Sequence, residues 1–133
     1  MNPSTLALIA APPDSLRYSL RALLARLPQI DEVRAVEDAR SLVAALTELS
    51  PRLIVVDANL LRTEAGAVLD KVKALAAQTK LVVLVDHIQQ QHALHTASAD
   101  LVLLKGHPAA DLFARLEQLL ADNPPDSDQG KSG

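Results

Sequence analysis

Two residues of opposite charge each follow a short apolar run, and both could carry charge into a crevice. Asp57 comes directly after Leu53–Val56, and Lys105 comes directly after Leu101–Leu104. If both runs are parallel strands of one sheet, their carboxyl ends open on the same crevice, which is where ligands bind in open α/β folds. A carboxylate and an ammonium placed there should pair. Two interpretations stay open: a functional site, or a pair in which each group only neutralises the other.

The segments around these residues predict the scaffold that positions them. The candidate strands are Leu6–Ala10, Glu32–Val36, Leu53–Val56, Leu81–Val85 and Leu101–Leu104. Apolar residues recur at helical spacing over residues 16–27, 42–49 and 68–75, more weakly over 88–97, and again after Pro108. Asp14 or Ser15 can cap the first helix. Five such strand–helix units predict an α/β, flavodoxin-like doubly wound (βα)5 sandwich with a five-stranded parallel sheet of order 2-1-3-4-5.

The composition limits the classes of function. The chain has 133 residues and a formal charge of −3, and its 13 Lys and Arg are scattered, so we expect no direct contact with nucleic acid. It has no cysteine, which excludes disulfides and thiolate chemistry. No stretch approaches the roughly 18 apolar residues of a membrane span. These features predict a soluble cytoplasmic protein with no membrane contact.

The same reading divides the chain into two parts. Residues 1–121 should form one domain, because the strand–helix pattern runs through them without a break. Residues 122–133 carry no apolar side chain to bury and are rich in Pro, Gly, Ser and Asp, so they favour a flexible linker or tail. Whether a further domain follows Gly133 stays open.

Other kinds of active site find little support. Pro12 and Pro13 remove two backbone donors where a nucleotide-binding loop would hold phosphate, and the chain has no glycine-rich loop. No serine has the surroundings of a hydrolase nucleophile. The four histidines lack a cysteine or a third ligand at suitable spacing, so they favour a polar surface over a metal site. They are His87, His92, His95 and His107. We therefore expect no enzyme.

Four stretches resemble, in their order and spacing, the receiver domain of response regulators in two-component signalling, the CheY-like family. They are LRALLARLP at 20–28, LIVVDANLLRTEAG at 53–66, LVVLVD at 81–86 and ADLVLLKGHPAADLFARL at 99–116. The resemblance covers about residues 5–121 and is particularly to the subgroup in which a helix-turn-helix output domain follows. It implies a role in phosphorelay signal transduction and transcription regulation.

The resemblance also implies roles for single residues. In the family, an Asp after the third strand accepts a phosphoryl group, an acidic pair after the first strand holds Mg²⁺ with it, and a Lys after the fifth strand holds a phosphoryl oxygen. The phosphoacceptor position falls on Asp57 and the Lys on Lys105. The loop carbonyl that helps to hold the metal falls on Asn59.

The remaining positions depart from the family's pattern. The acidic pair falls on Ala11 and Pro12, which supply no side-chain oxygen for Mg²⁺. A Ser or Thr that meets the phosphoryl group in the family falls on Val85, and the small residue after it falls on Asp86. The aromatic residue that reports the switch falls on Val102. These departures predict a degenerate site in which Asp57 is a poor acceptor.

Two nearby acids are unsuitable replacements for the lost pair. Asp14 is expected to cap the first helix, and Glu64 suits the start of the third, where an acid favours the helix dipole. The metal candidates that remain are Asp57 and Asn59, which are too few for a Mg²⁺ site. We therefore expect no cofactor.

These observations lead to a prediction with two alternatives. The chain is expected to be a pseudo-receiver, a regulatory interaction or dimerisation module that works without phosphorylation and can control a DNA-binding output domain. A homodimer would use the surface of the fourth helix, fifth strand and fifth helix, roughly residues 88–99 and 109–121. One alternative is a working receiver that a histidine kinase phosphorylates on Asp57 with Mg²⁺. The other is a sensor that binds a small ligand in the crevice.

Overall fold

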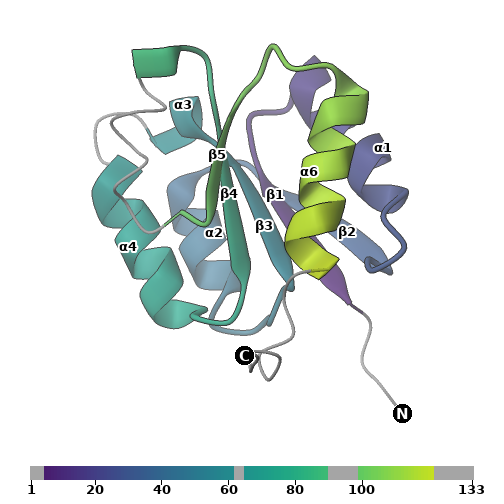
Figure 1. Cartoon of the computed structure of the whole chain (residues 1–133). Helices are drawn as coiled ribbons and strands as arrows, with labels where there is room; N and C mark the ends of the chain where they lie inside the picture. Colours follow the sequence, from purple (N-terminus) through teal and green to yellow (C-terminus); the bar gives the residue numbers. More distant parts are fainter. Residues whose placement is uncertain (1–4, 62–64, 90–98, 122–133) are drawn as a thin grey trace, which may run out of the picture.

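The computed structural model describes residues 5–61, 65–89 and 99–121 of the chain. Within them five parallel strands form one sheet: β1 (Leu6–Ala10), β2 (Glu32–Val36), β3 (Leu53–Asp57), β4 (Lys80–Val85) and β5 (Leu101–Leu104). The strand order is β2-β1-β3-β4-β5, so β3 is central and β5 forms an edge (Figure 1). This order confirms the predicted doubly wound, flavodoxin-like sandwich. No helix within the described ranges is long and apolar enough to cross a bilayer.

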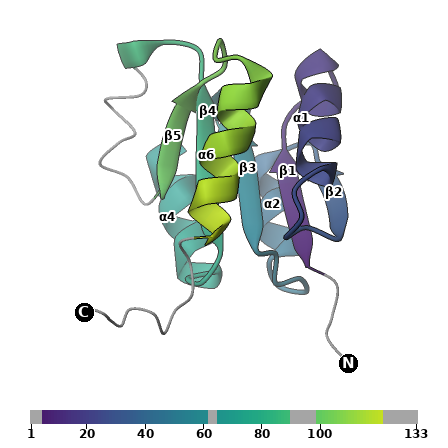
Figure 2. The same ribbon diagram turned by 45° about the vertical axis from the view of Figure 1, so that its right-hand side comes forward.

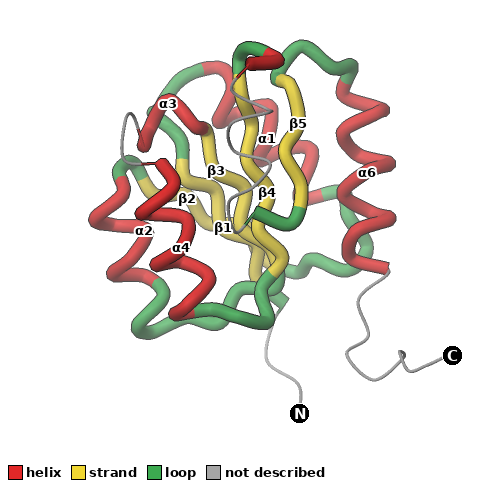
Figure 3. The backbone as a smooth tube through the Cα atoms, turned by 60° about the vertical axis from the view of Figure 1, so that its left-hand side comes forward, coloured by secondary structure: helices red, strands yellow, loops and turns green. Residues whose placement is uncertain are grey.

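Helices cover both faces of the sheet. On one face lie α1 (Ser15–Ala25) and α6 (Ala109–Ala121), which Figure 2 shows side by side in front of the strands. On the other face lie α2 (Ala39–Ala45) and α4 (Ala65–Leu75), which Figure 3 shows across the sheet from α6. The short helix α3 (Ala58–Leu61) follows β3 directly. The carboxyl ends of the strands point toward the top of Figure 1.

The core consists of two layers because side chains on a strand alternate between the faces of the sheet. Ala7 and Ile9 of β1 pack in the cluster that includes the buried leucines of α1 and α6. Leu8 and Ala10 pack in the opposite cluster, against Leu42 and the buried residues of α4. Because β1 and β3 are buried along their whole length, their sequences are continuous apolar runs up to Asp57 at the end of β3. These buried strands give the residues at their ends a rigid base.

Local signals explain where the first two helices begin and end. The Asp14 side chain accepts hydrogen bonds from the backbone N–H groups of Leu16 and Arg17, so it caps α1 as expected. The second helix ends at Ala45 rather than at residue 49, and in this respect the prediction was wrong. The N–H groups of Leu46 and Thr47 bond to carbonyls three residues earlier, which tightens the chain into a turn before Pro51.

The structure has one short helix that the sequence did not predict, and two predicted segments lie mostly or wholly outside the described residues. The helix α3 was not anticipated, because four residues are too few to show a helical period. The expected helix at residues 88–97 falls mostly on residues 90–98, outside the described part of the chain; Ile88 and Gln89, which are described, have helical geometry. Residues 122–133, the expected linker or tail, also lie outside it.

Candidate functional site

The predicted pair of opposite charges forms at the carboxyl ends of the strands. Lys105 Nζ lies 2.7 Å from Asp57 Oδ1. Asp57 is 3% exposed, one of few polar residues in the buried core. The same oxygen, Oδ1, also accepts a hydrogen bond of 2.9 Å from the backbone N–H of Asn59. The buried carboxylate is therefore both neutralised and hydrogen-bonded, as a charge at such a depth requires.

A second carboxylate shares the same ammonium. Asp86 Oδ1 lies 3.2 Å from Lys105 Nζ. The other oxygen of Asp86, Oδ2, accepts a hydrogen bond of 2.6 Å from the side-chain amide of Asn59. Residues at or just after the ends of β3, β4 and β5 are thus joined in one network, which we call the tip network: Asp57, Asn59, Asp86 and Lys105. It contains two carboxylates and one ammonium.

The strand register places these groups together. Asp57 pairs with Leu84 across β3 and β4, and Val85 pairs with Leu104 across β4 and β5. The backbone N–H of Lys105 donates to the carbonyl of Val85 at 2.8 Å, which continues the ladder one residue beyond β5. Because the main chain is paired up to the point where each side chain emerges, the positions of the charged groups are set by the sheet.

The contacts in the tip network shift two pKa values. The hydrogen bond from Asn59 lowers the pKa of the Asp86 carboxyl, with a smaller contribution from Lys105 that acts against partial burial. Burial by itself would lower the pKa of Lys105, but the hydrogen bonds and charges of Asp57 and Asp86 outweigh it and raise that pKa. Both groups therefore remain charged at neutral pH.

The end of β1 carries no acid. Ala10 pairs with Val56, so Ala11 follows β1 at the end of the sheet where Asp57 follows Val56. The Ala11 side chain is fully buried, and its carbonyl accepts hydrogen bonds from Arg17 Nε and a terminal guanidinium nitrogen at 3.3 and 3.1 Å. The Arg17 guanidinium also lies 3.7 Å from Glu37. A cationic side chain of the protein thus covers this strand end.

The residues present do not fit a Mg²⁺ ion of the kind the resemblance implies. Mg²⁺ requires several hard oxygen ligands in a tight octahedron. Ala11 and Pro12 have no side-chain oxygen, and Asp57 Oδ1 already faces an ammonium and an N–H group. Asp14 is engaged in capping α1, and Glu64 lies outside the described residues. In the described ranges no group of three or more His, Cys, Asp or Glu side chains could hold a metal.

The two positions implied to carry a switch are filled by buried valines. Val85 is fully buried, and Val102 is 6% exposed. Both belong to the core cluster on the α2 and α4 side of the sheet. Neither side chain offers a hydroxyl or an aromatic ring at the end of the crevice.

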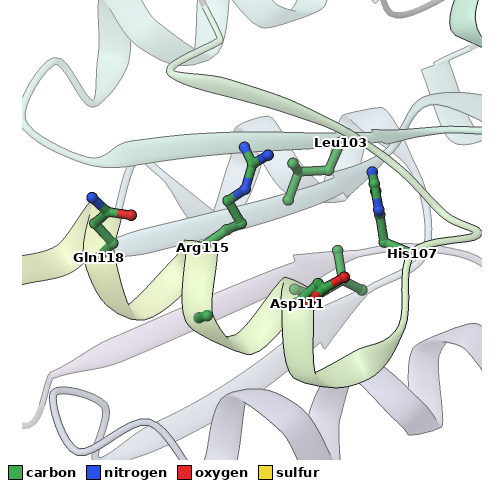
Figure 4. A pocket seen from close by; sticks show the side chains of 7 residues that line it. Leu103, His107, Asp111, Arg115 and Gln118 are labelled. Atoms are coloured by element: carbon green, nitrogen blue, oxygen red, sulfur yellow. The ribbon is translucent and has the colours of Figure 1, made fainter.

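A hollow lies between the edge strand β5 and α6. It has a volume of about 400 Å³. Figure 4 shows side chains of α6 and of the preceding loop, among them Arg115 and His107, extending toward Leu103 of β5. The other residues that line it are Asp111, Leu112, Ala114 and Gln118. This hollow lies on the surface expected to form a dimer.

Sequence reasoning found part of the site and missed part. It anticipated that Asp57 and Lys105 would meet, and they do. It treated Asp86 only as a departure from the family's pattern, and it missed the contacts of Asp86 with Lys105 and Asn59. The signal was available, because an acid directly after a buried strand next to a lysine-bearing strand should pair with it. His92 and His95 lie outside the described residues.

Comparison with solved structures shows the same fold. A response-regulator receiver domain from Methanospirillum hungatei has a TM-score of 0.77 at 19% identity, covering 91% of this chain and 97% of that one. A two-component response regulator of the LuxR family from Aurantimonas sp. has 0.75 at 20%, covering 96% and 94%. The receiver domain of a sensor histidine kinase from Pseudomonas aeruginosa, with magnesium coordinated in its active-site cleft, has 0.75 at 16%, covering 90% and 100%.

Comparisons by sequence give no match. No family model matches the chain. No curated protein matches it. The structural likeness nevertheless confirms the fold that the resemblance implied: this chain has the fold of response-regulator receiver domains.

Proposed function

We propose that the chain is a receiver-like module of signal transduction that acts through protein contacts and is not switched by phosphorylation of Asp57. The observation that carries this proposal is the occupancy of Lys105, whose ammonium contacts the carboxylates of both Asp57 and Asp86. The group that would hold a phosphoryl oxygen is therefore already engaged by the chain itself.

The electrostatics of the crevice argue against a phosphoryl group. Transfer to a carboxylate depends largely on neutralising the charge of the transferred group, which a metal and a lysine do together. Here two carboxylates face one ammonium, so the tip network carries a net charge of −1 before any phosphoryl group arrives. At ~4 Å and an effective dielectric of about 20, each additional like-charge pair costs about 4 kcal/mol. Without acids at Ala11 and Pro12, no metal offsets that cost.

The residues that would carry a signal after phosphorylation are also missing. The resemblance implies a hydroxyl that follows the phosphoryl group and an aromatic ring that moves with it. Val85 and Val102 supply neither and are packed in the core. We therefore propose that any signal enters through a change of binding partner.

The contact surface we propose includes β5, α6 and the hollow between them. The charged side chains of Asp111 and Arg115 at its rim favour a protein partner, each such pair being worth about 1 kcal/mol or less. We propose two partners for this surface, a second copy of this chain and a DNA-binding output domain. Sedimentation velocity of the wild type and of Arg115→Glu tests the homodimer: we expect a concentration-dependent dimer that the variant weakens.

One observation favours the alternative of a working phosphoacceptor. Asp57 and Lys105 lie 2.7 Å apart at the position that the resemblance assigns to them, and Asn59 donates a backbone N–H to the same carboxylate. A makeshift site could use these three groups without the acidic pair.

Intact-mass spectrometry separates the two functions. The wild type is incubated with acetyl phosphate and Mg²⁺, with Asp57→Asn as the control. We expect no adduct in either protein. A labile gain of about 80 Da in the wild type, lost in Asp57→Asn, is the result that supports the working receiver instead.

A further inference from the structure

Asp86 links the groups that follow the two strands next to its own. It follows β4, yet its two carboxylate oxygens contact groups that follow the strands on either side. Oδ1 lies 3.2 Å from Lys105 Nζ, and Oδ2 accepts a hydrogen bond of 2.6 Å from the Asn59 side chain. Its side chain is 37% exposed, whereas that of Asp57 is 4% exposed, so Asp86 lies nearer to solvent in the network.

Neutralisation alone does not account for this carboxylate. Asp57 and Lys105 already form a pair of one negative and one positive charge at 2.7 Å. A second carboxylate leaves the network with an excess negative charge, which is favourable only where hydrogen bonds to that carboxylate compensate for it. The amide of Asn59 and the ammonium of Lys105 provide them. These two donors are also the kind that bind an oxyanion from solution.

We propose that Asp86 is the resident anion of the crevice: its carboxylate takes the place on Lys105 and Asn59 that a free oxyanion such as phosphate would otherwise occupy. This inference rests on the proposed function, since it names the means by which the same site is kept in one state. The carboxylate is part of the chain, so its local concentration at Lys105 exceeds that of a dissolved competitor.

The consequence is a positioning role for Asp86. Its contacts hold Asn59, after β3, and Lys105, after β5, in a fixed relation to β4. Lys105 is followed within the same segment by His107, which lines the hollow beside α6. In this protein the arrangement that a bound anion would impose at the strand ends is therefore permanent, and the adjoining contact surface does not depend on an added group.

Removal of the resident anion should create a binding site. Inorganic phosphate is titrated to 20 mM, on the order of the millimolar range of weak anion sites, into ¹⁵N-labelled full-length wild type and Asp86→Ala at constant ionic strength. We expect the backbone amide signals of Asn59 and Lys105 to shift and saturate in Asp86→Ala and to stay unchanged in the wild type. Adding Lys105→Ala to Asp86→Ala should abolish the response.

Two further variants make the comparison specific. Glu48→Ala removes one exposed carboxylate near the opposite end of β3 and should leave the response as in the wild type, which controls for net charge. Asp86→Asn keeps the volume of the side chain and decides the question if Asp86→Ala does not fold. The proposal is overturned if folded Asp86 variants do not respond to phosphate, or if the wild type responds as strongly as they do.

Failure of this inference and failure of the proposed function give different experimental results. Phosphorylation of the wild type on Asp57 would contradict that function whatever the Asp86 variants do. Absence of phosphate binding in those variants would leave the function intact and refute only the role of Asp86.

Discussion

The guanidinium of Arg17 donates two hydrogen bonds, of 3.1 and 3.3 Å, to the carbonyl of Ala11 at the end of β1. The Arg17 side chain is only 18% exposed, so its charge is largely withdrawn from water. A hydrogen bond that involves a charged group contributes about 1.5–3 kcal/mol. Arg17 thus stabilises the strand end at which the resemblance would place acids.

Replacement of Arg17 by Ala should lower the free energy of unfolding by about 1.5 kcal/mol, because the Ala11 carbonyl loses its charged donors. Arg21 lies one turn further along α1 and is exposed, so Arg21→Ala is the matched control and should change it by less than about 0.5 kcal/mol. Urea unfolding measures both. Equal effects of the two substitutions would show that the Arg17 contact contributes nothing of its own.

Replacement of Lys105 by Met should destabilise the protein by about 2–4 kcal/mol, because Asp57 then remains as a buried carboxylate without its cation. The double variant Asp57→Asn with Lys105→Met should recover most of that loss, since it leaves no unpaired charge at the buried position. Thermal and urea unfolding of Lys105→Met, Asp57→Asn and the double variant give the coupling free energy between Asp57 and Lys105. A double variant less stable than Lys105→Met would contradict this explanation.

Because the pKa of Lys105 is raised in the folded protein, we expect its contribution to stability to be lost at alkaline pH. A group whose pKa is higher in the folded state stabilises fully below its unfolded pKa, here about 10.4, and that contribution is lost as the pH rises through the folded value. The difference in unfolding free energy between wild type and Lys105→Met should therefore shrink above about pH 10.4. A difference that stays constant up to the folded pKa would argue against the two ion pairs.

The lowered pKa of Asp86 predicts an effect at acid pH. The carboxylate stabilises the fold above its unfolded pKa, about 3.9, and this contribution disappears as the pH falls through the lower folded value. Because the Asn59 amide is the main cause, Asn59→Ala should raise the pKa of Asp86 toward its usual value. Carboxyl ¹³C chemical shifts followed through a pH titration measure it, and an unchanged pKa in Asn59→Ala would refute the assignment.

Much of the fold follows from the sequence. The strands lie close to where the apolar runs predicted them, because β1, β3 and β4 are buried on both faces and are apolar except at one end of β3 and of β4. The end of α2 could not be predicted from the sequence, because Leu46 and Leu49 keep a helical spacing although the helix has already ended at Ala45. Spacing records which side chains are buried and not which backbone hydrogen bonds form.

The candidate site was predictable only in part for a related reason. Asp57 and Lys105 each end an apolar run, so the topology alone brings them to one edge of the sheet. The contact between Asn59 and Asp86 depends on the short helix α3 and on side-chain rotamers. Neither produces a periodic pattern of apolar residues in the sequence. The hydrogen bonds from Arg17 to a backbone carbonyl are equally hidden, because a carbonyl has no sequence signature.

The most direct test of a crevice that does not accept a phosphoryl group is ¹⁹F NMR of the wild type with beryllofluoride and Mg²⁺, a mimic of the acyl phosphate. We expect only the signals of free fluoroberyllates, the same in the wild type and in Asp57→Asn. A protein-bound signal in the wild type that is absent in Asp57→Asn would contradict it.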